Sequence, residues 1–342
     1  MIKGNNYLIT GGLGLIGSNI VKNIFKNEKN SKCIILDNFT VYIDPIKSAF
    51  GDFRKNRFDE VINKSEYRNS KTERVIIERG NAADPRVTIE ILRKYKPKII
   101  FHTAAMPLAR VNNPIAKEFR EGSVDTTVNL LECVDQIQKE SSYKLKRFLY
   151  ISSSMVYGDF KKDEAKESDD LCPKEIYGTM KLAGEIATKG MCKQYSIPYT
   201  IVRPSAVYGP TDMNQRVTQY FIEKAINKEK LIVHGKDEKL DFTYIEDLVS
   251  GTILAATNPK GANETFNITF GEAKTLLDYV KILRIHFKNL KFQVVSRDKY
   301  RPKRGTLNID KAKDLLGFNP KFNLEKGTSL YVKFIKKIKK NN

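Results

Sequence analysis

The feature that most constrains the fold of this chain is a glycine-rich segment at residues 7–17, YLITGGLGLIG. An apolar stretch leads into three glycines, Gly11, Gly14 and Gly17, at intervals of three residues. In a strand–turn–helix unit, glycines at these positions permit a tight turn, the approach of a pyrophosphate to the backbone, and close packing of the helix on the strand. The segment therefore predicts the start of a dinucleotide-binding fold.

A second apolar stretch ends in Asp37, twenty residues after Gly17. An acidic residue at this distance holds the hydroxyls of the adenosine ribose and repels a 2′-phosphate. Asn38 adds no positive charge, so the predicted cofactor is NAD rather than NADP. The first helix is predicted at about residues 16–25, with Leu15 and Ile16 at its start, and we expect the N–H groups of its first turn to face the pyrophosphate.

Apolar stretches and amphipathic helices alternate as far as residue 207, with a polar connection of weak helical pattern at residues 40–73. Continuous apolar strands separated by helices are typical of a parallel sheet that is covered on both faces. The pattern predicts an α/β fold with a doubly wound parallel sheet, a Rossmann fold. Shorter elements follow beyond residue 210 and predict a smaller α+β domain at the carboxyl terminus. Its strands are predicted at 231–233, 265–268 and 292–295.

This change of pattern predicts where the chain divides. We expect residues 1–207 to form the NAD-binding domain, which also receives about residues 243–257. Residues 208–342 are expected to form the substrate-binding domain.

Composition excludes several other classes of protein. The chain has 60 Lys and Arg residues against 40 Asp and Glu, a formal net charge of +20, but its basic residues are spread out. A solvated surface explains this better than a nucleic-acid-binding face, so nucleic acid is not an expected partner. No segment has the ~20 uninterrupted apolar residues that span a bilayer. Without a signal sequence, a CxxC pair or grouped histidines, we expect a cytoplasmic protein with no metal site.

Tyr177 and Lys181 lie four residues apart, on one face of a helix predicted at 177–195. A nearby ammonium lowers the pKa of a phenol from its usual ~10, which makes the tyrosine usable as a base near neutrality. The preceding strand ends in three serines, at residues 152–154. At the carboxyl end of the sheet, Ser153 can hydrogen-bond the same substrate oxygen as Tyr177. These three residues are the predicted catalytic group.

Further segments complete a pattern that covers almost the whole chain. The pattern consists of residues 10–17, Asp37, 102–105, 152–158, Tyr177 with Lys181, 203–210, 241–247, 301–302 and 316–320. With these residues the sequence resembles the extended short-chain dehydrogenase/reductases, in their group of NAD-dependent nucleotide-sugar epimerases and dehydratases. The resemblance implies that the second domain binds a UDP- or GDP-linked sugar.

The resemblance also implies roles for residues. Tyr177 takes a proton from a sugar hydroxyl, Ser153 positions that hydroxyl, and Lys181 holds the nicotinamide ribose. A homodimer on two long helices, near residues 114–138 and 177–195, is implied as well. The other implied NAD contacts are Asn81, Ala82, Ala104, Ala105, Ser123 and Pro204, and the implied substrate contacts include Ser154, Met155, Arg216, Val217 and Arg301.

Some positions depart from the family pattern. The dehydratases of the family carry an Asp-Glu pair where this chain has Ser154 and Met155, and a thioether cannot serve as acid or base for water elimination. Asn81 stands where the family usually has an aspartate that meets the adenine, although an amide can still pair with the base. Ser123 and Leu240 replace an asparagine facing the active site and an arginine that touches the nucleotide phosphates.

The chemistry that remains is oxidation at C4 of the sugar. Return of the hydride to the other face of the ring makes a nucleotide-sugar C4-epimerase, which we predict. An alternative is a 4-dehydrogenase that releases a 4-keto product, for example from a GDP-heptose in surface-polysaccharide synthesis. An alternative of another class is a non-catalytic NAD-binding protein with a basic partner-binding surface.

Overall fold

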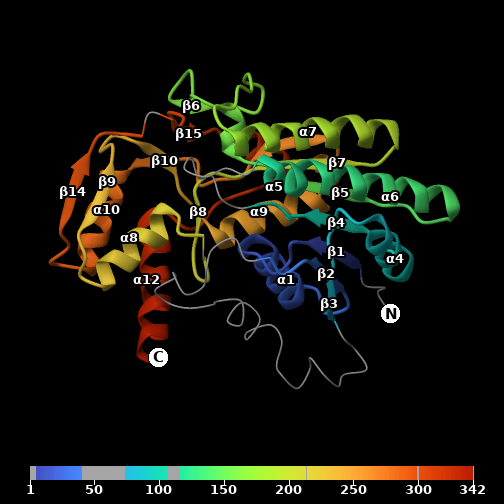
Figure 1. Ribbon diagram of the computed structural model, residues 1–342, viewed down its shortest axis with the longest axis horizontal. Helices are drawn as coiled ribbons and strands as arrows, with labels where there is room; N and C mark the ends of the chain where they lie inside the picture. Colours follow the sequence, from blue (N-terminus) through green and yellow to red (C-terminus); the bar gives the residue numbers. More distant parts are fainter. Residues whose placement is uncertain (1–4, 41–73, 107–115, 213, 299, 342) are drawn as a thin grey trace.

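The computed structural model describes residues 5–40, 74–106, 116–212, 214–298 and 300–341 (Figure 1). Most of the polar connection predicted at 40–73 lies outside these ranges. The described residues form one large unit around a central sheet and a smaller unit beside it, at the left of Figure 1.

The central sheet is parallel throughout. Over the described ranges its strands are β1 (Asn6–Thr10), β2 (Lys32–Asp37), β3 (Val75–Arg79), β4 (Ile99–His102), β5 (Arg147–Ile151), β7 (Tyr199–Arg203) and β12 (Glu264–Asn267). They lie in the order β12-β7-β5-β4-β1-β2-β3, so the strand order reverses between β1 and β4. In such sheets the ligand binds at the reversal, outside the carboxyl ends of the strands. The predicted doubly wound α/β fold is confirmed.

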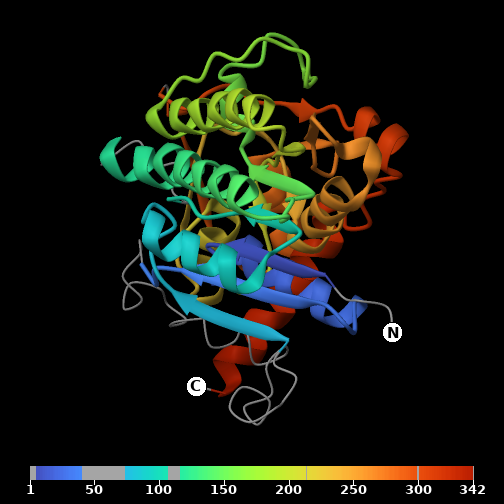
Figure 2. The ribbon, with the colours of Figure 1, turned by 90° about the vertical axis from the view of Figure 1, so that its right-hand side faces the viewer.

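Helices cover both faces of the sheet. On one face α1 (Leu15–Asn27) packs against α9 (Ile245–Thr257). On the other face α4 (Pro85–Tyr95), α6 (Thr126–Glu140) and α7 (Ile176–Gln194) follow one another, and Figure 2 shows α6 and α7 side by side.

Two hydrophobic cores result, one on each face of the sheet. Along β1, Tyr7 and Ile9 belong to the core that contains the apolar side of α1, whereas Leu8 belongs to the core that contains α6. Successive side chains of a strand point to opposite faces, so each strand must be apolar along its whole length to fill both cores. This requirement explains the continuous apolar stretches of the sequence.

The helix before β5 contains an irregular turn. A short helix, α5 (Ala116–Arg120), continues through a π-helical turn, η2 (Glu121–Asp125), into α6. A π turn holds more residues than an α turn, and such turns occur frequently at functional sites. It changes the direction in which the side chains of η2 point relative to those of α6.

The smaller unit is built from short strands and helices, as predicted. Its strand pairs include β9 (Leu231–His234) with β14 (Phe292–Val295), β10 (Lys239–Asp241) with β13 (Ala273–Thr275), β8 (Val207–Tyr208) with β11 (Thr243–Tyr244), and β6 (Glu164–Ala165) with β15 (Thr306–Leu307). Its helices include α8 (Val217–Ile226), α10 (Leu276–His286) and α12 (Leu324–Asn341), whereas α11 (Asp310–Leu316) packs against α9 and β12 on the main sheet.

One strand lies in a different unit from the one predicted. The strand expected at 265–268 is β12, which pairs with β7 at the edge of the main sheet rather than lying in the smaller unit. The preceding helix, α9, packs against β5 and β7, so the chain is already on the main sheet when β12 begins. A four-residue apolar stretch does not indicate its own pairing partner, which is why the sequence pattern misplaced it.

Gly184 lies where α7 crosses the helix before β5. A Cβ built at Gly184 would approach the Ser123 carbonyl oxygen to 2.5 Å and collide with the Tyr150 hydroxyl, whereas a Cβ at the exposed Gly190 has no neighbour within 4 Å. We expect Gly184→Ala to lower the free energy of unfolding by about 1–3 kcal/mol, because α7 must move. In the matched control, Gly190→Ala should raise it by up to about 1 kcal/mol. Urea denaturation measures both, and equal effects would contradict the prediction.

Candidate active site

A cavity of about 370 Å³ lies where the strand order reverses. Residues that follow β1, β2, β3 and β4 line it, together with the start of α1. The predicted residues on its wall are Gly11, Gly14, Leu15, Ile16, Gly17, Asp37, Asn38, Asn81, Ala82, Ala104, Ala105 and, from the predicted substrate group, Arg216.

The glycine-rich turn has the geometry that its spacing predicts. Gly11 adopts a left-handed backbone conformation, with φ +65°, and a Cβ there would lie 2.7 Å from the Cα of Ala104. A Cβ at Gly17 would lie 2.7 Å from the carbonyl oxygen of Gly11, so α1 starts in close contact with the turn. Helix α1 begins after Gly14 without a side-chain cap from the described residues, which leaves its first N–H groups available to an anion.

The carboxylate of Asp37 is held in place by the backbone on both sides. Its oxygens accept hydrogen bonds from the N–H of Leu13, at 3.0 Å, and from the N–H of Phe39, at 2.8 Å. Asp37 therefore connects the glycine-rich turn to the end of β2, where an adenosine ribose is bound in dinucleotide folds. Three features of this cavity fit NAD. They are the uncapped start of α1, the glycine-rich turn that presents no Cβ atoms, and the carboxylate of Asp37.

The predicted catalytic group lies after the carboxyl end of β5 and in the first turns of α7. Ser153 caps a 3₁₀ helix, η3 (Ser154–Tyr157), and its hydroxyl oxygen accepts the N–H of Met155 at 3.2 Å. The Ser153 hydroxyl also shares a hydrogen bond with the phenol of Tyr177. Glu175 caps α7 by accepting the N–H groups of Tyr177 and Gly178 at 2.9 and 2.7 Å, which fixes the helix start opposite Ser153.

The pKa of Tyr177 is raised, contrary to the expectation from sequence. Burial is the main cause, and the groups that oppose it are the Arg216 guanidinium and the hydrogen bond from Ser153, rather than Lys181. The ammonium of Lys181 instead donates to the carbonyl of Ile151 at 2.7 Å. Burial lowers the pKa of Lys181 to about 7, against the opposing charge of Glu185. The predicted lowering of the Tyr177 pKa by Lys181 was therefore wrong.

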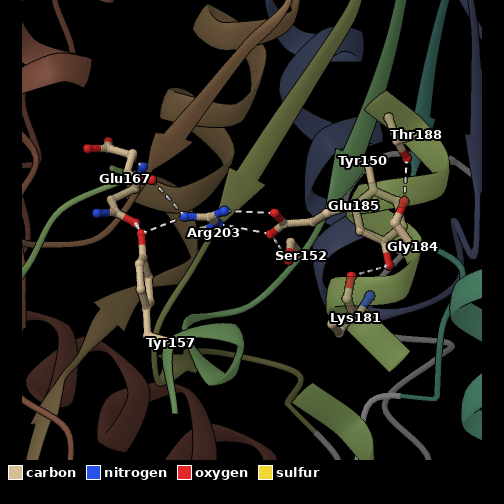
Figure 3. A network of polar contacts seen from close by, with 10 residues as sticks. Tyr150, Ser152, Tyr157, Glu167, Lys181, Gly184, Glu185, Thr188 and Arg203 are labelled. Atoms are coloured by element: carbon tan, nitrogen blue, oxygen red, sulfur yellow. Dashed lines mark hydrogen bonds and ion pairs between the residues drawn. The ribbon is translucent and has the colours of Figure 1, made fainter. Parts of the chain in front are cut away.

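A buried ion pair lies behind this group (Figure 3). Arg203 of β7 donates to both oxygens of Glu185 of α7, at 2.9 and 2.7 Å, and the two side chains are 1% and 0% exposed. Glu185 also accepts the hydroxyl of Ser152 at 2.5 Å, and Arg203 donates to the phenol oxygen of Tyr157 at 2.9 Å. The network joins α7 and β7 to Ser152, which precedes Ser153 in the chain, and to Tyr157, which follows Ser154.

The remaining predicted residues lie away from the wall of the cavity. Ser123, Ser154, Met155 and Pro204 are buried, and Val217 is half-buried against the core. Arg301 is exposed and forms an ion pair with Asp298 at 3.6 Å.

The structure adds wall residues that the sequence did not indicate. They include Phe39, Glu118, Glu121, Gly122 and Asn214. Glu121 and Gly122 belong to η2, and a π turn interrupts the 3.6-residue period on which helix prediction depends. Asn214 comes from the segment before α8, far along the chain, and the sequence carries no signal for it.

His102 is a structural residue. It is buried, its ring nitrogens contact the hydroxyls of Thr10, Thr126 and Thr127 at 2.7–3.2 Å, and burial lowers its pKa to about 3. Among the described residues, no three or more His, Cys, Asp or Glu side chains are grouped so that they could hold a metal ion. None of the described helices combines the length and apolar character needed to cross a membrane.

Comparison with known sequences agrees with this site. Residues 7–269 match the model of the NAD dependent epimerase/dehydratase family. The chain is 29% identical to a dTDP-D-glucose 4,6-dehydratase of Dictyostelium discoideum, over 71% of this chain and 53% of that protein, so the match spans about half of the relative. It is 26% identical to an uncharacterized UDP-glucose epimerase of Bacillus subtilis, over 96% of this chain and 97% of that protein.

This chain also resembles a solved structure. The UDP-glucuronic acid 4-epimerase of Bacillus cereus, crystallised with UDP-glucuronic acid and NAD, superimposes with a TM-score of 0.83 at 27% identity, over 97% of this chain and 99% of that one. Fold and site thus define an NAD-binding protein of the extended short-chain dehydrogenase/reductase type. Within that type, the chain belongs to the NAD dependent epimerase/dehydratase family.

The buried ion pair generates a stability prediction. Glu185→Ala leaves the Arg203 guanidinium buried without its counter-charge, and we expect the free energy of unfolding to fall by about 3–5 kcal/mol. The double variant Glu185→Met/Arg203→Met removes both charges and should recover at least about 1 kcal/mol of this loss. Both are measured by urea denaturation at neutral pH. A single variant within about 1 kcal/mol of the original protein would show that the pair is unimportant.

Proposed function

We propose that this protein oxidises C4 of a nucleotide-activated sugar with NAD and acts as a nucleotide-sugar C4-epimerase. The observation that carries the proposal is the position of the Tyr177 phenol, bonded to Ser153 at the end of β5. Tyr177 stands at the start of α7, and α7 packs against η2, whose Glu121 and Gly122 line the dinucleotide cavity. A base and a hydride acceptor can then reach the same carbon of a substrate.

When bound, NAD accepts a hydride and returns it. The residues of this chain handle the proton and the position of the sugar. Tyr177 accepts the proton of the 4-hydroxyl, and Ser153 holds the same oxygen by a hydrogen bond. Burial raises the pKa of the Tyr177 phenol, and Arg216 and Ser153 oppose that rise, so we assign to these two residues the stabilisation of the phenolate. Lys181, held by the carbonyl of Ile151, is assigned to the nicotinamide ribose.

The neighbours of Ser153 support oxidation without water elimination. Ser154 and Met155 are 1% and 6% exposed, and neither side chain can act as a general acid or base at neutral pH. A dehydratase needs such a pair after the oxidation step. The reaction proposed here therefore ends either with hydride return to the other face of the ring or with release of the 4-keto sugar.

Arginines beside α7 suit the diphosphate of the nucleotide. Arg301 is 46% exposed and carries a long ion pair of 3.6 Å. Arg304 is half-buried and has neither an ion pair nor a hydrogen bond with any residue in the described ranges, and burial and Arg301 lower its pKa to about 10. A buried guanidinium without a partner is favourable once an anion is bound. We assign Arg301 and Arg304 to a UDP or GDP diphosphate.

Substitution of the phenol tests the reaction. We expect Tyr177→Phe to lose at least about 100-fold in turnover, because it removes the only proposed proton acceptor. The same variant should retain bound NAD, because Asp37 and the glycine-rich turn are unchanged. Turnover is followed by chromatography of UDP- and GDP-sugars, and NAD by its absorbance after denaturation. Full turnover by this variant would overturn the catalytic assignment.

The products made by the unaltered protein distinguish the epimerase from the 4-dehydrogenase. A C4 epimer with no net reduction of NAD supports the epimerase. Accumulation of a 4-keto sugar together with NADH would identify a 4-dehydrogenase instead.

We further propose a cytoplasmic homodimer formed through α6 and α7, which lie side by side (Figure 2). Ile186 on α7 is 63% exposed, and a large apolar side chain in that position suits an interface between copies. Ile186→Lys should convert the dimer to a monomer, as measured by light scattering after size exclusion. Ile285→Lys, at a 71% exposed position on α10, is the matched control and should leave the mass unchanged. An original protein that is monomeric at micromolar concentration would contradict the proposal.

A further inference from the structure

We propose that the carboxylate of Glu121 recognises the adenine of NAD by accepting a hydrogen bond from its amino group. The acidic residue belongs to the π-helical turn η2 and lines the same cavity as Asp37 and the glycine-rich turn. The inference concerns the selection of the cofactor base. It stands whether or not the sugar chemistry proposed above is correct.

The position of the adenine follows from the sheet. The pyrophosphate belongs at the start of α1, and the adenosine ribose at Asp37 after β2. The base lies one step further from the pyrophosphate, and β3 is the next strand in the sheet. Residues directly after β3, among them Asn81 and Ala82, line the cavity. The adenine therefore lies near Asn81.

The side chain of Asn81 is already engaged by the protein. Its carbonyl oxygen accepts the N–H of Ala83 at 2.9 Å, and its amide nitrogen donates to Glu121 at 2.8 Å. The first bond fixes the orientation of the amide, because only the oxygen can accept from a backbone N–H. With its oxygen on Ala83, Asn81 presents its donor side to Glu121 and keeps one neutral acceptor lone pair for an adenine amino group.

Glu121 offers a charged acceptor, which is stronger than the neutral amide oxygen of Asn81. It lines the same cavity, and one of its oxygens, Oε1, receives the Asn81 amide. The other oxygen, Oε2, has no hydrogen-bond partner among the residues that the structure describes. Asn81 thus orients the carboxylate and leaves one oxygen for a ligand. Glu121 is the first residue of the π turn that carries the chain from α5 into α6.

The chemistry of the base makes this contact selective. The 6-amino group of adenine donates, and its hydrogen bond to a carboxylate is charge-assisted. Hypoxanthine carries a carbonyl oxygen at the same position, which would face the carboxylate oxygen with no proton between them. NAD and its hypoxanthine analogue, nicotinamide hypoxanthine dinucleotide, differ in this group, so their relative affinity reports on Glu121.

The experiment measures displacement of NADH from the full-length protein. NADH fluorescence falls or shifts as NAD or the hypoxanthine analogue replaces it, and the chain has no tryptophan to interfere. For the original protein, half-displacement should need at least about tenfold more analogue than NAD. Glu121→Gln should reduce this ratio to about threefold or less, because a glutamine can turn its amide to donate to the carbonyl. Glu121→Ala frees the Asn81 amide to donate in the same way and should bring the ratio to about one or below.

Each ratio is measured on one protein with two ligands, so a loss of stability in a variant cancels. Glu118→Gln is the matched control, because Glu118 lines the same cavity without touching Asn81 in the described structure, and its ratio should equal that of the original protein. The proposal is overturned if the original protein does not discriminate, if Glu121→Gln keeps the original ratio, or if Glu118→Gln changes it instead. Turnover does not enter the measurement, so failure of the proposed sugar chemistry would leave these outcomes unchanged.

Discussion

The candidate site depends on the buried ion pair between Glu185 and Arg203. Charges so fully removed from water are costly unless each meets an opposite charge and further hydrogen bonds. Both conditions are met here, with Ser152 bonded to the carboxylate and Tyr157 to the guanidinium. Ser152 directly precedes Ser153 in the chain, and Tyr157 follows it a few residues later. Because both are bonded to the ion pair, the pair holds the loop after β5 against α7. Ser153 and Tyr177 belong to the two segments that the pair joins, the loop after β5 and α7.

The same pair governs the charge of Lys181, one helical turn before Glu185. Burial alone favours a neutral amine, and the charge of Glu185 opposes that effect, so that the pKa of Lys181 is about 7. Arg203 satisfies both carboxylate oxygens and keeps the acid in place. A cationic Lys181 at neutral pH therefore depends on residues that lie behind the site.

Much of the fold and part of the site could be predicted because the relevant signals are local. The turn at Gly11, the contact at Gly17 and the carboxylate of Asp37 act within one strand–turn–helix unit, where spacing along the chain determines spacing in the molecule. The pairing of β12 with β7 and the arrival of Glu121 at the cavity depend on packing between distant segments. Neither leaves a periodic pattern, so neither could be predicted.

The pKa of Tyr177 could not be predicted from the spacing of Tyr177 and Lys181 along the chain. A separation of four residues places Tyr177 and Lys181 on one helical face, but it does not indicate what else a buried ammonium contacts. Lys181 donates to the carbonyl of Ile151, because a buried donor without an acceptor is costly. The charge that favours the phenolate comes instead from Arg216, which precedes α8. The spacing thus identifies the two residues of the pair, whereas burial raises the pKa of Tyr177 and lowers the pKa of Lys181 to about 7.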